Sequence, residues 1–446
     1  MATSVNGFSK LTKQEKITWL ATQHFKNKET GIEILKQYWN SDVKLQRLHD
    51  EFIENTVSNF YLPLGIAPNF LINGKYHTIP MAIEESSVVA AAGNAAKYWQ
   101  KRGGFKAEVL GTEKVGQVHF IYPGEVDKLK TFFSQVKQKL FDATLGITEN
   151  MRKRNGGITS ITLRDKTEDL QQYFQLHCTF ETKDAMGANF NNSCLETIAK
   201  TFESELRNSE LFSPKEKEVQ IVMSILSNYV PNCRVRASVS CKIDELVADK
   251  NMDALDFAQK FVRAVEIAKI EPHRAVTHNK GIMNGIDAVV LATGNDFRAI
   301  EAGVHAYAAK DGSYKSLSKA SIEGDVFTFS LELPLALGTV GGLTNLHPLV
   351  KLSLEILDHP SAEELMQIVA TAGLAQNFAA IRSLITEGIQ KGHMKMHLLN
   401  ILNHLGATPE QKAYFTSHFK NKTISHNEVI AQFNALKEED DAHVPK

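Results

Sequence analysis

The chain has 446 residues, more than one ordinary hydrophobic core accommodates, so we expect either two domains or a large and a small one. Its 50 basic and 51 acidic side chains nearly cancel, which predicts no broad electrostatic surface for nucleic acid or for an anionic membrane. No two cysteines have CxxC spacing, so we expect neither a disulfide framework nor a zinc site and favour a reducing, cytoplasmic location; the four are Cys178, Cys194, Cys233 and Cys241.

The N-terminal segment lacks the apolar run of a signal peptide. Thr12 and Glu15 have the spacing of a capping box, which predicts that a helix begins there, and apolar positions over 12–60 follow helical spacing. No run in the chain approaches eighteen apolar residues, so we predict no transmembrane helix.

Small residues over 88–96 predict a helix that packs closely on its neighbours. Glu85, Ser86 and Ser87 precede this helix. The free amide groups and the positive dipole end of a helix N-terminus would suit the carboxylate of an anionic substrate. The alternative is that Ser86 or Ser87 simply caps the helix.

The pattern changes between residues 110 and 228. We expect a strand, a helix, two strands, a helix and a strand, in that order, at 117–122, 125–145, 157–163, 173–182, 191–206 and 218–226. This order is typical of the ferredoxin-like fold, so we predict a compact insert within a larger, mainly helical domain. A smaller helical segment follows residue 388, and the acidic residues 437–446 predict a disordered tail.

The densest polar stretch of the chain covers residues 271–285 and contains two His, one Arg, one Lys and two Asn. It leads into apolar residues 286–293 and ends at Asp296. This layout predicts an active-site loop that precedes a buried element. A lysine near a carboxylate can donate to a carbonyl oxygen and stabilise developing negative charge, which makes Lys280 and Asp296 a candidate pair. The alternative is a solvated polar loop.

The chain has no GxGxxG motif, so a dinucleotide would not bind through a Rossmann fingerprint. Residues 184–189 offer a substitute: a turn between a strand and a helix, where Gly187 lets the backbone approach a phosphate at the helix N-terminus. A capped turn is the alternative. The glycine-rich segment 338–348 lacks the lysine and spacing of a P-loop, and we interpret it as a turn near the active site.

The polar stretch belongs to a set of motifs that resembles the catalytic core of 3-hydroxy-3-methylglutaryl-CoA (HMG-CoA) reductase, in its soluble bacterial class II form. The core motifs are THNKGIMNG at 277–285, ATGND at 292–296 and RAIEAG at 298–303. Four further signatures occur in the family's order: ENTV at 54–57, EESSVVA at 84–90, DAMGAN at 184–189 and GIQKGHM at 388–394. The resemblance therefore extends over nearly the whole chain.

The resemblance implies that two hydrides from a nicotinamide cofactor reduce HMG-CoA to mevalonate and release CoA. It implies that Lys280 donates a hydrogen bond to the carbonyl oxygen of the substrate. Asp296 would tune this lysine, and Glu85 would complete the proton network. His393 would protonate the departing CoA thiolate, because the pKa of histidine suits that task near neutrality; by itself it would be one surface histidine among several. The resemblance implies that the substrate is bound by Ser87, Arg274, Asn284 and Asn377. It implies that the cofactor is bound by Asp184, Met186, Gly187 and Asn189.

The resemblance also implies an α+β architecture. It comprises a large domain at 1–109 and 229–387, a ferredoxin-like dinucleotide-binding domain at 110–228, a helical C-terminal flap at 388–436 and the tail at 437–446. A homodimer or higher homo-oligomer is expected, with the site formed across the interface. Thr56-Val57-Ser58 replaces the family's more usual Val-Ile-Gly at a motif associated with that interface, which leaves the interface detail open.

We expect NADPH as the cofactor, with NADH possible. Lys139 falls near the position where the NAD-using type places an acidic residue, and a lysine there would attract the 2′-phosphate of NADPH. The alternatives are that Lys137 and Lys139 only solvate their helix, or that Asp142 occupies the position in a shifted register. Two other functions stay open. One is NAD-dependent oxidation of mevalonate to HMG-CoA. The other is CoA binding without catalysis, but binding alone would not require Glu85, Lys280, Asp296 and His393 together.

Overall fold

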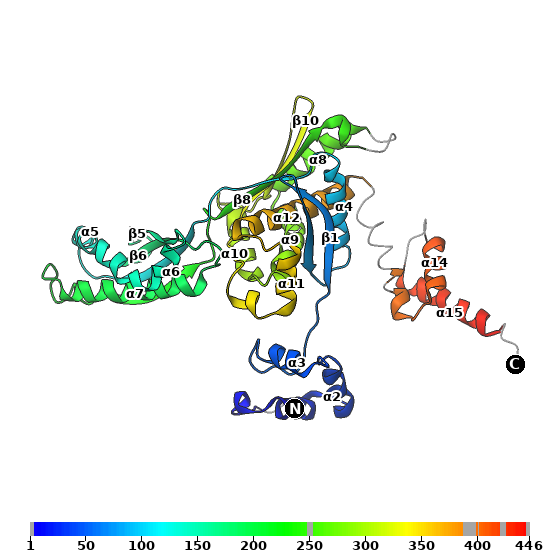
Figure 1. Ribbon diagram of the computed structural model, residues 1–446, viewed down its shortest axis with the longest axis horizontal. Coiled ribbons are helices and arrows are strands. Elements are labelled where there is room, and N and C mark those ends of the chain that lie inside the picture. Colours follow the sequence, from blue (N-terminus) through cyan, green and yellow to red (C-terminus); the bar gives the residue numbers. More distant parts are fainter. Residues whose placement is uncertain (1–3, 248–252, 387–397, 400, 420–424, 443–446) are drawn as a thin grey trace. The chain divides into compact units, whose positions relative to one another are not determined.

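The computed structural model describes residues 4–247, 253–386, 398–399, 401–419 and 425–442. The chain divides into two compact units, residues 1–63 and residues 64–446, and each is described by itself (Figure 1). Our expected large domain began at residue 1, whereas the first 63 residues pack mainly among themselves.

The first unit is helical up to Asp50, which confirms the helical prediction for residues 12–50, whereas residues 51–60 form no helix. Its elements are η1 (Phe8–Lys10), α1 (Lys13–His24), α2 (Lys28–Gln37) and α3 (Val43–Asp50). The predicted capping box is confirmed, because Glu15 N–H donates to the Thr12 hydroxyl and Thr12 N–H donates to the Glu15 carboxylate. These bonds satisfy two amide groups that the first helical turn leaves without partners.

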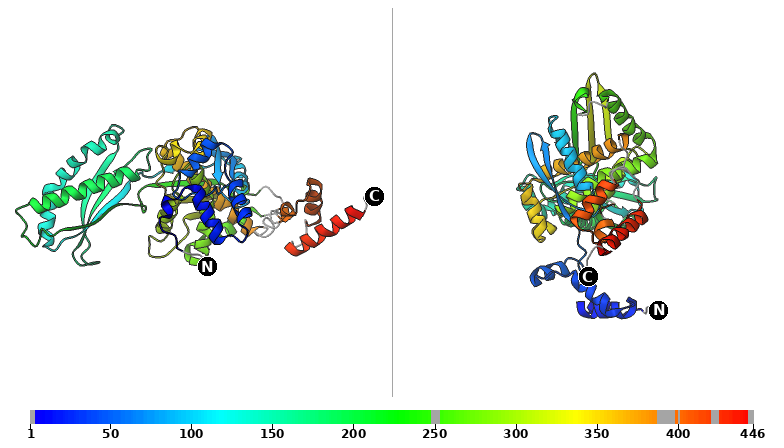
Figure 2. Two further views of the ribbon diagram at one scale, coloured as in Figure 1. Left: turned by 90° about the horizontal axis from the view of Figure 1, so that it is seen from below. Right: turned by 90° about the vertical axis from the view of Figure 1, so that its right-hand side faces the viewer.

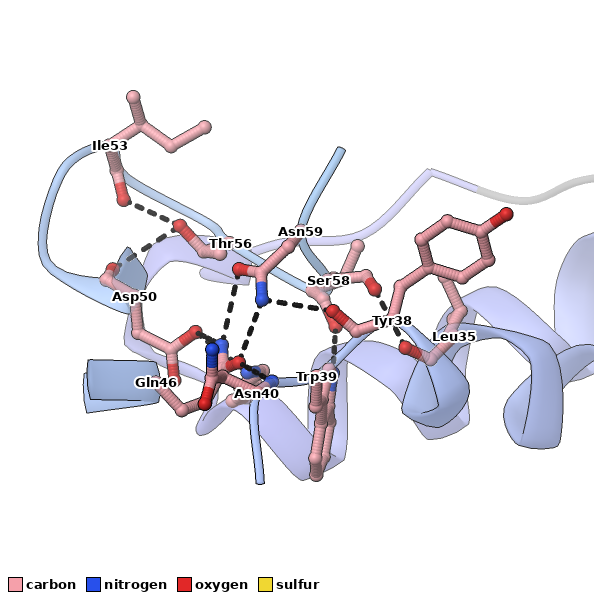
Figure 3. A network of polar contacts seen from close by, with 12 residues as sticks. Leu35, Tyr38, Trp39, Asn40, Gln46, Asp50, Ile53, Thr56, Ser58 and Asn59 are labelled. Carbon is pink, nitrogen blue, oxygen red and sulfur yellow. Dashed lines mark hydrogen bonds and ion pairs between the residues drawn. The ribbon is translucent and has the colours of Figure 1, made fainter. Parts of the chain in front are cut away.

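Polar contacts hold the segment that follows α3 (Figure 3). Trp39 Nε1–H donates to the carbonyl oxygen of Val57 at 3.0 Å, and the Ser58 hydroxyl donates to that of Leu35 at 2.6 Å. The side chain of Phe60 nevertheless stays 93% exposed. The segment around the ENTV motif is thus fixed by hydrogen bonds while it presents apolar surface to solvent.

The second unit contains a body of helices around a four-stranded antiparallel sheet of order β3-β8-β10-β9, with a separate β1-β2 hairpin (Figure 1). The strands are β1 (Leu64–Ile72), β2 (Lys75–Ala82), β3 (Lys106–Val109), β8 (Arg234–Lys242), β9 (Ser318–Glu323) and β10 (Val326–Pro334). The helices are α4 (Val88–Gln100), η2 (Ile243–Glu245), α8 (Ala254–Ile270), α9 (Pro272–Ala292), α10 (Phe297–Ala308), η3 (Gly342–Asn345), α11 (Pro348–Ile356) and α12 (Ala362–Ile385).

Helices α9 and α12 form the centre of this body, and glycines allow them to approach closely. A Cβ at Gly285 would lie 2.6 Å from the carbonyl oxygen of Ala372, and one at Gly373 would lie 2.8 Å from Ile286. In the described part of the chain, α12 alone is long and apolar enough to cross a membrane, but 67% of its apolar stretch is buried inside the protein. This burial is that of a core helix.

The insert has the predicted elements in the predicted order, with one additional helix, α6, that the sequence did not predict. They are β4 (Lys114–Ile121), α5 (Val126–Ala143), α6 (Leu145–Arg152), β5 (Gly157–Asp165), β6 (Tyr173–Glu181), α7 (Ala188–Asn208) and β7 (Gln220–Ser227). The antiparallel strand order β5-β6-β4-β7 is that of a ferredoxin-like fold. Helices α5 and α7 pack on one face of the sheet (Figure 2), over a core rich in phenylalanine: Phe120, Phe132, Phe174, Phe180 and Phe202.

The C-terminal elements are α14 (Pro409–His418) and α15 (His426–Ala442), which share a small apolar core with Leu398 and Leu402. The predicted disordered tail is wrong for residues 437–442, because they continue α15. Lys437, Glu438 and Glu439 have high helix propensity, so a helix that has already started at His426 extends through them and on through Asp440 and Asp441, whose propensity is lower.

Candidate active site

The polar stretch 271–285 is part of helix α9, so the predicted active-site loop is wrong. Pro272 occupies the first turn, and the Glu271 carboxylate accepts a hydrogen bond from Arg274 N–H at 2.6 Å. Proline at this position and an acidic cap both favour the start of a helix. The polar residues therefore lie at helical spacing, which places Lys280 and Asn284 one turn apart on the same face.

Lys280, Asn284 and Glu85 form a cluster between α9 and the turn that precedes α4. The Lys280 ammonium lies 2.7 Å from Glu85 Oε2, and the Asn284 carboxamide donates to the same oxygen at 3.3 Å. The side chains of Lys280 and Glu85 are 60% and 37% exposed. An ion pair this exposed adds little stability, but its ammonium stays within reach of a ligand.

Ser87 adjoins this cluster and has a backbone conformation that L-residues rarely adopt. Its φ is 73°, and its side chain makes no capping hydrogen bond although it occupies the N-cap position of α4. The alternative of simple capping by Ser87 is therefore wrong. The first-turn amide groups of α4 lack that cap, which leaves them suited to an anionic ligand.

Arg274 is the half-buried cation on α9. Among the described residues its guanidinium has no hydrogen bond or ion pair, and burial lowers its pKa. One turn further along, His278 is buried and its Nε2 lies 2.7 Å from the Ser318 hydroxyl. Burial, with a smaller effect of Arg274, lowers the pKa of His278 to about 3, so this histidine is neutral. Arg274 is thus available to a carboxylate ligand.

Asn377 lies in α12, which packs against α9. It is 1% exposed, and its Oδ1 has no hydrogen-bond partner among the described residues. A buried amide oxygen without a partner is unusual and calls for a water molecule or a ligand to satisfy it.

Asp296 is not beside Lys280 in the single chain. Helix α9 rises about 18 Å from Lys280 to its last residue, Ala292, and Asp296 lies in the turn that follows, paired with Arg298 while Lys280 pairs with Glu85. Asp296 instead caps α10 and accepts hydrogen bonds from Arg298 N–H at 3.0 Å and from Arg298 Nε at 3.1 Å. Burial acts to raise the pKa of Asp296, but these hydrogen bonds outweigh it and the pKa is lowered.

The DAMGAN segment forms the predicted turn between strand β6 and helix α7. Gly187 has φ +92°, and a Cβ there would lie 2.5 Å from the Thr182 methyl group, so only glycine fits. Asp184 anchors the turn: its carboxylate accepts from Ala362 N–H at 2.9 Å, and its carbonyl oxygen accepts from Thr339 N–H at 2.8 Å. No side chain caps α7, so its first-turn amide groups can receive a phosphate.

The turn that carries Asp296 lies beside the DAMGAN segment. The Asn295 carboxamide oxygen accepts from Gly338 N–H at 2.8 Å, and a Cβ at Gly338 would lie 2.4 Å from Met186 N. Gly338 of the glycine-rich segment thus lies beside candidate site residues, and Gly342–Asn345 of the same segment form the short helix η3. The chain thus carries two separate groups of candidate residues: Lys280 with Glu85 and Asn284, and Asp296 with the DAMGAN segment.

Lys139 contacts a different part of the insert. Its ammonium lies 2.7 Å from Glu205 of α7. Glu205 is seventeen residues beyond Ala188, about 25 Å along the helix axis from the DAMGAN turn. Asp142 accepts a hydrogen bond from Gln138 on its own helix at 2.9 Å. Neither contact joins these residues to the DAMGAN segment.

His393 lies outside the described residues, so the structure does not place it. Among the residues that the structure does describe, no group of three or more His, Cys, Asp or Glu side chains could hold a metal ion.

Comparisons with known proteins give one consistent result. The family model described as hydroxymethylglutaryl-coenzyme A reductase matches residues 13–398. The 3-hydroxy-3-methylglutaryl-coenzyme A reductase of Archaeoglobus fulgidus is 37% identical over 413 residues, which cover 92% of this chain and 89% of the relative. A probable enzyme of the same name from Borreliella burgdorferi is 37% identical over 363 residues, which cover 80% of each chain.

Solved structures of reductases also match. A 3-hydroxy-3-methylglutaryl-coenzyme A reductase from Streptococcus pneumoniae has a TM-score of 0.71 at 34% identity, with 97% of this chain and 100% of that chain covered. A structure of the class II enzyme from the same organism, bound to NADPH in open conformations, has a TM-score of 0.70 at 35% identity and covers 86% and 100%.

Proposed function

The chain belongs to the hydroxymethylglutaryl-CoA reductase family and is an NAD(P)H-dependent oxidoreductase, and from this premise we propose how its residues reduce HMG-CoA to mevalonate and CoA. The observation that carries the proposal is the Lys280–Glu85–Asn284 cluster. It combines a cation, a carboxylate and an amide at the surface of α9, where a thioester carbonyl can approach.

Lys280 donates a hydrogen bond to the substrate's carbonyl oxygen. The nicotinamide, when bound, supplies the hydride that adds to the carbonyl carbon. Negative charge then develops on the oxygen, and a fixed ammonium stabilises it. Glu85 holds the ammonium in place through its 2.7 Å contact and can exchange a proton with it, while Asn284 orients the carboxylate from the same side. The same arrangement serves the reduction of the thioester and that of the aldehyde.

Arg274, Ser87 and Asn377 bind the rest of the substrate. The free guanidinium of Arg274 suits the terminal carboxylate, since a carboxylate can accept two parallel hydrogen bonds from it. Ser87 offers a hydroxyl that is not used in capping, and Asn377 offers a buried amide whose oxygen lacks a partner. We assign these roles from the geometry together with the family's motifs.

The enzyme works as a homodimer or a higher homo-oligomer. Asp296 tunes a lysine in the family's scheme, yet in one chain Lys280 pairs with Glu85 and Asp296 pairs with Arg298. Asp296 of the partner subunit completes the site if the two groups of residues face each other across an interface. The exposed apolar surface at Phe60, next to the ENTV motif, supports an interface there.

Residues 110–228 bind the cofactor, and Asp184, Met186, Gly187 and Asn189 line its site. The uncapped start of α7 and the Gly187 turn fit a dinucleotide phosphate. NADPH is the proposed cofactor, in keeping with the NADPH-bound pneumococcal relative. The contact of Lys139 with Glu205 argues against its role at the 2′-phosphate and favours the alternative that it belongs to the helix surface.

The C-terminal segment 388–436 closes over bound CoA, excludes water and brings His393 to the thiolate, which it protonates. We propose that the reaction takes place in the cytoplasm in the direction of mevalonate formation. These assignments rest on the family's motifs, because His393 lies outside the described residues.

Replacing Lys280 with alanine tests the function. We expect Lys280→Ala to lower the rate of HMG-CoA-dependent NADPH oxidation by about 100-fold or more, because it removes a transition-state donor, while CoA still binds. The matched control is Lys260→Ala, which removes another exposed lysine with a carboxylate partner at 2.7 Å and should leave the rate unchanged. Turnover near that of the wild type in Lys280→Ala would contradict the proposal.

A further inference from the structure

The carboxylate of Asp184, in the DAMGAN segment, is bound to a helix that lies far away in the sequence. Its Oδ1 accepts a hydrogen bond at 2.9 Å from the backbone N–H of Ala362, the first residue of α12, which lies 178 positions further along the chain. The positive end of the α12 dipole also favours a negative charge at this place. Asp184 thus joins the turn that precedes α7 to the start of α12.

Helix α12 does not need this contact in order to form. Ser361 and Glu364 make a capping box, and Glu363 and Glu364 already place two negative charges in the first turn. The capping box leaves Ala362 N–H to another acceptor, which Asp184 supplies. The contact therefore holds two distant segments together and is not required to start the helix.

The backbone of the same turn is bound to a second part of the body. The Asp184 carbonyl oxygen accepts from Thr339 N–H at 2.8 Å and from Val340 N–H at 3.3 Å. Ala185 forms a parallel β-bridge with Val340. The DAMGAN turn is therefore fixed on the body at two places, and Asp184 supplies an acceptor for both.

The direction of the Asp184 carboxylate also suits an anionic cofactor. A dinucleotide carries negative charge, and a carboxylate directed at it would repel it. The contact with Ala362 instead directs the charge of Asp184 to α12. The fixed turn lies beside the segment that carries Asp296, because Gly338, which lies against the turn, donates its N–H to Asn295 at 2.8 Å.

We propose that Asp184 is a positioning residue, whose carboxylate anchors the cofactor turn on α12 and does not bind the cofactor itself. This inference rests on the proposed cofactor role of the DAMGAN segment and states how Asp184 serves that role. Hydride transfer requires a fixed distance and angle between the nicotinamide and the substrate carbonyl, and a displacement of about 1 Å can cost about 100-fold in rate. Release of the turn from α12 should therefore impair the reaction more than it impairs binding.

The first test separates the rate from binding. Asp184→Ala removes the carboxylate from the full-length protein, whereas Asp184→Asn keeps a side-chain oxygen that can accept from Ala362 N–H. We expect kcat for NADPH oxidation with HMG-CoA to fall by about 10- to 100-fold in Asp184→Ala and to recover largely in Asp184→Asn. The dissociation constants for NADPH and CoA, measured by calorimetry, should stay nearly unchanged in both variants.

The second test needs no turnover. Hydrogen exchange, followed by mass spectrometry, measures the protection of the peptide that contains Ala362, with and without NADPH. Bound NADPH orders the DAMGAN turn, so it should slow the exchange of this peptide in the wild type. Asp184→Ala should abolish the response, because the link between the turn and α12 is lost. A carboxylate that only stabilised the fold would not make α12 respond to NADPH.

Two further variants complete the design. Ala362→Pro removes the donor of the same hydrogen bond, at a first helical position that accepts proline and after Ser361, which is already extended. It should reproduce the effects of Asp184→Ala, and the double variant should be no worse than either single one. Asp253→Ala is the control, because it removes a carboxylate that accepts from a first-turn amide of α8 at 2.7 Å. It should leave kcat and the exchange response unchanged.

Unchanged kcat in folded Asp184→Ala and Ala362→Pro would overturn the proposal, and so would a wild-type α12 peptide whose exchange does not respond to NADPH. A loss of NADPH affinity in both Asp184 variants would place the carboxylate on the cofactor and would overturn it too. If Asp184→Ala does not fold, Ala362→Pro decides the question. Wild-type protein that binds no NADPH would instead refute the proposed function, so the two failures are distinguishable.

Discussion

Pairing of inactive subunits tests whether the active site is shared between two chains. Lys280 and Asp296 make no ion pair with each other in one chain, and α9 rises about 18 Å between Lys280 and its last residue, Ala292, so we expect a site that uses both to take them from different subunits. A heterodimer of one Lys280→Ala chain and one Asp296→Ala chain then contains one intact site and one site that lacks both residues.

The expected activity of that heterodimer is about half that of the wild-type dimer, although each homodimeric variant is nearly inactive. The reciprocal heterodimer joins a wild-type chain to a chain with both substitutions. Each of its two sites lacks one residue, so it should be nearly inactive.

The assay uses co-expression of the two chains with different affinity tags, two-step purification of the mixed species, and NADPH oxidation with HMG-CoA. The two heterodimers contain the same substitutions in the same number and differ only in their distribution between chains. A site within one chain predicts the reverse result, in which the first heterodimer is inactive and the second retains half the activity. That result would refute the shared site.

Three further predictions follow from individual side chains. His393→Gln should slow the reduction of HMG-CoA far more than that of free mevaldehyde, which releases no thiolate; equal losses on both substrates would contradict its role as the thiolate acid. Lys139→Asp should leave the ratio of kcat/KM for NADPH and NADH nearly unchanged, because Lys139 contacts Glu205. A large shift of this ratio towards NADH would show instead that Lys139 binds the 2′-phosphate. Burial, together with the neighbouring Glu301, raises the pKa of Asp287 to about 8. The folded protein therefore binds a proton that the unfolded chain releases above pH 4, so the free energy of unfolding should fall as the pH rises towards 8. Asp287→Asn should remove this part of the pH dependence, and identical unfolding curves for both proteins at pH 5 and pH 8 would exclude it.

Local sequence patterns predicted the elements of the insert well. Alternation and helical spacing placed its strands and helices within a few residues, and Thr12 with Glu15 predicted the start of α1. These features depend on neighbours in the sequence, so their physical causes are visible there. The DAMGAN turn was likewise predictable, because Gly187 supplies a backbone conformation that few other residues adopt.

The polar stretch shows where local reasoning failed. The density of polar residues indicated a loop, yet residues 272–292 form one helix. Gly285 is needed for the close approach of α12 and does not interrupt the helix. Tertiary packing here overrides the low helix propensity of glycine.

The sequence by itself determined which chemical groups the protein has: Lys280, Glu85, Asp296 and the motifs around them. Only the tertiary structure decided which of these groups meet. It joined Lys280 to Glu85 across 195 positions of sequence and kept Asp296 apart, although Asp296 is far closer along the chain. It also buried Lys114, the first residue of β4, which nothing in the alternation of that strand indicated. Burial and distance depend on how remote segments pack, and that information is absent from any local pattern of residues.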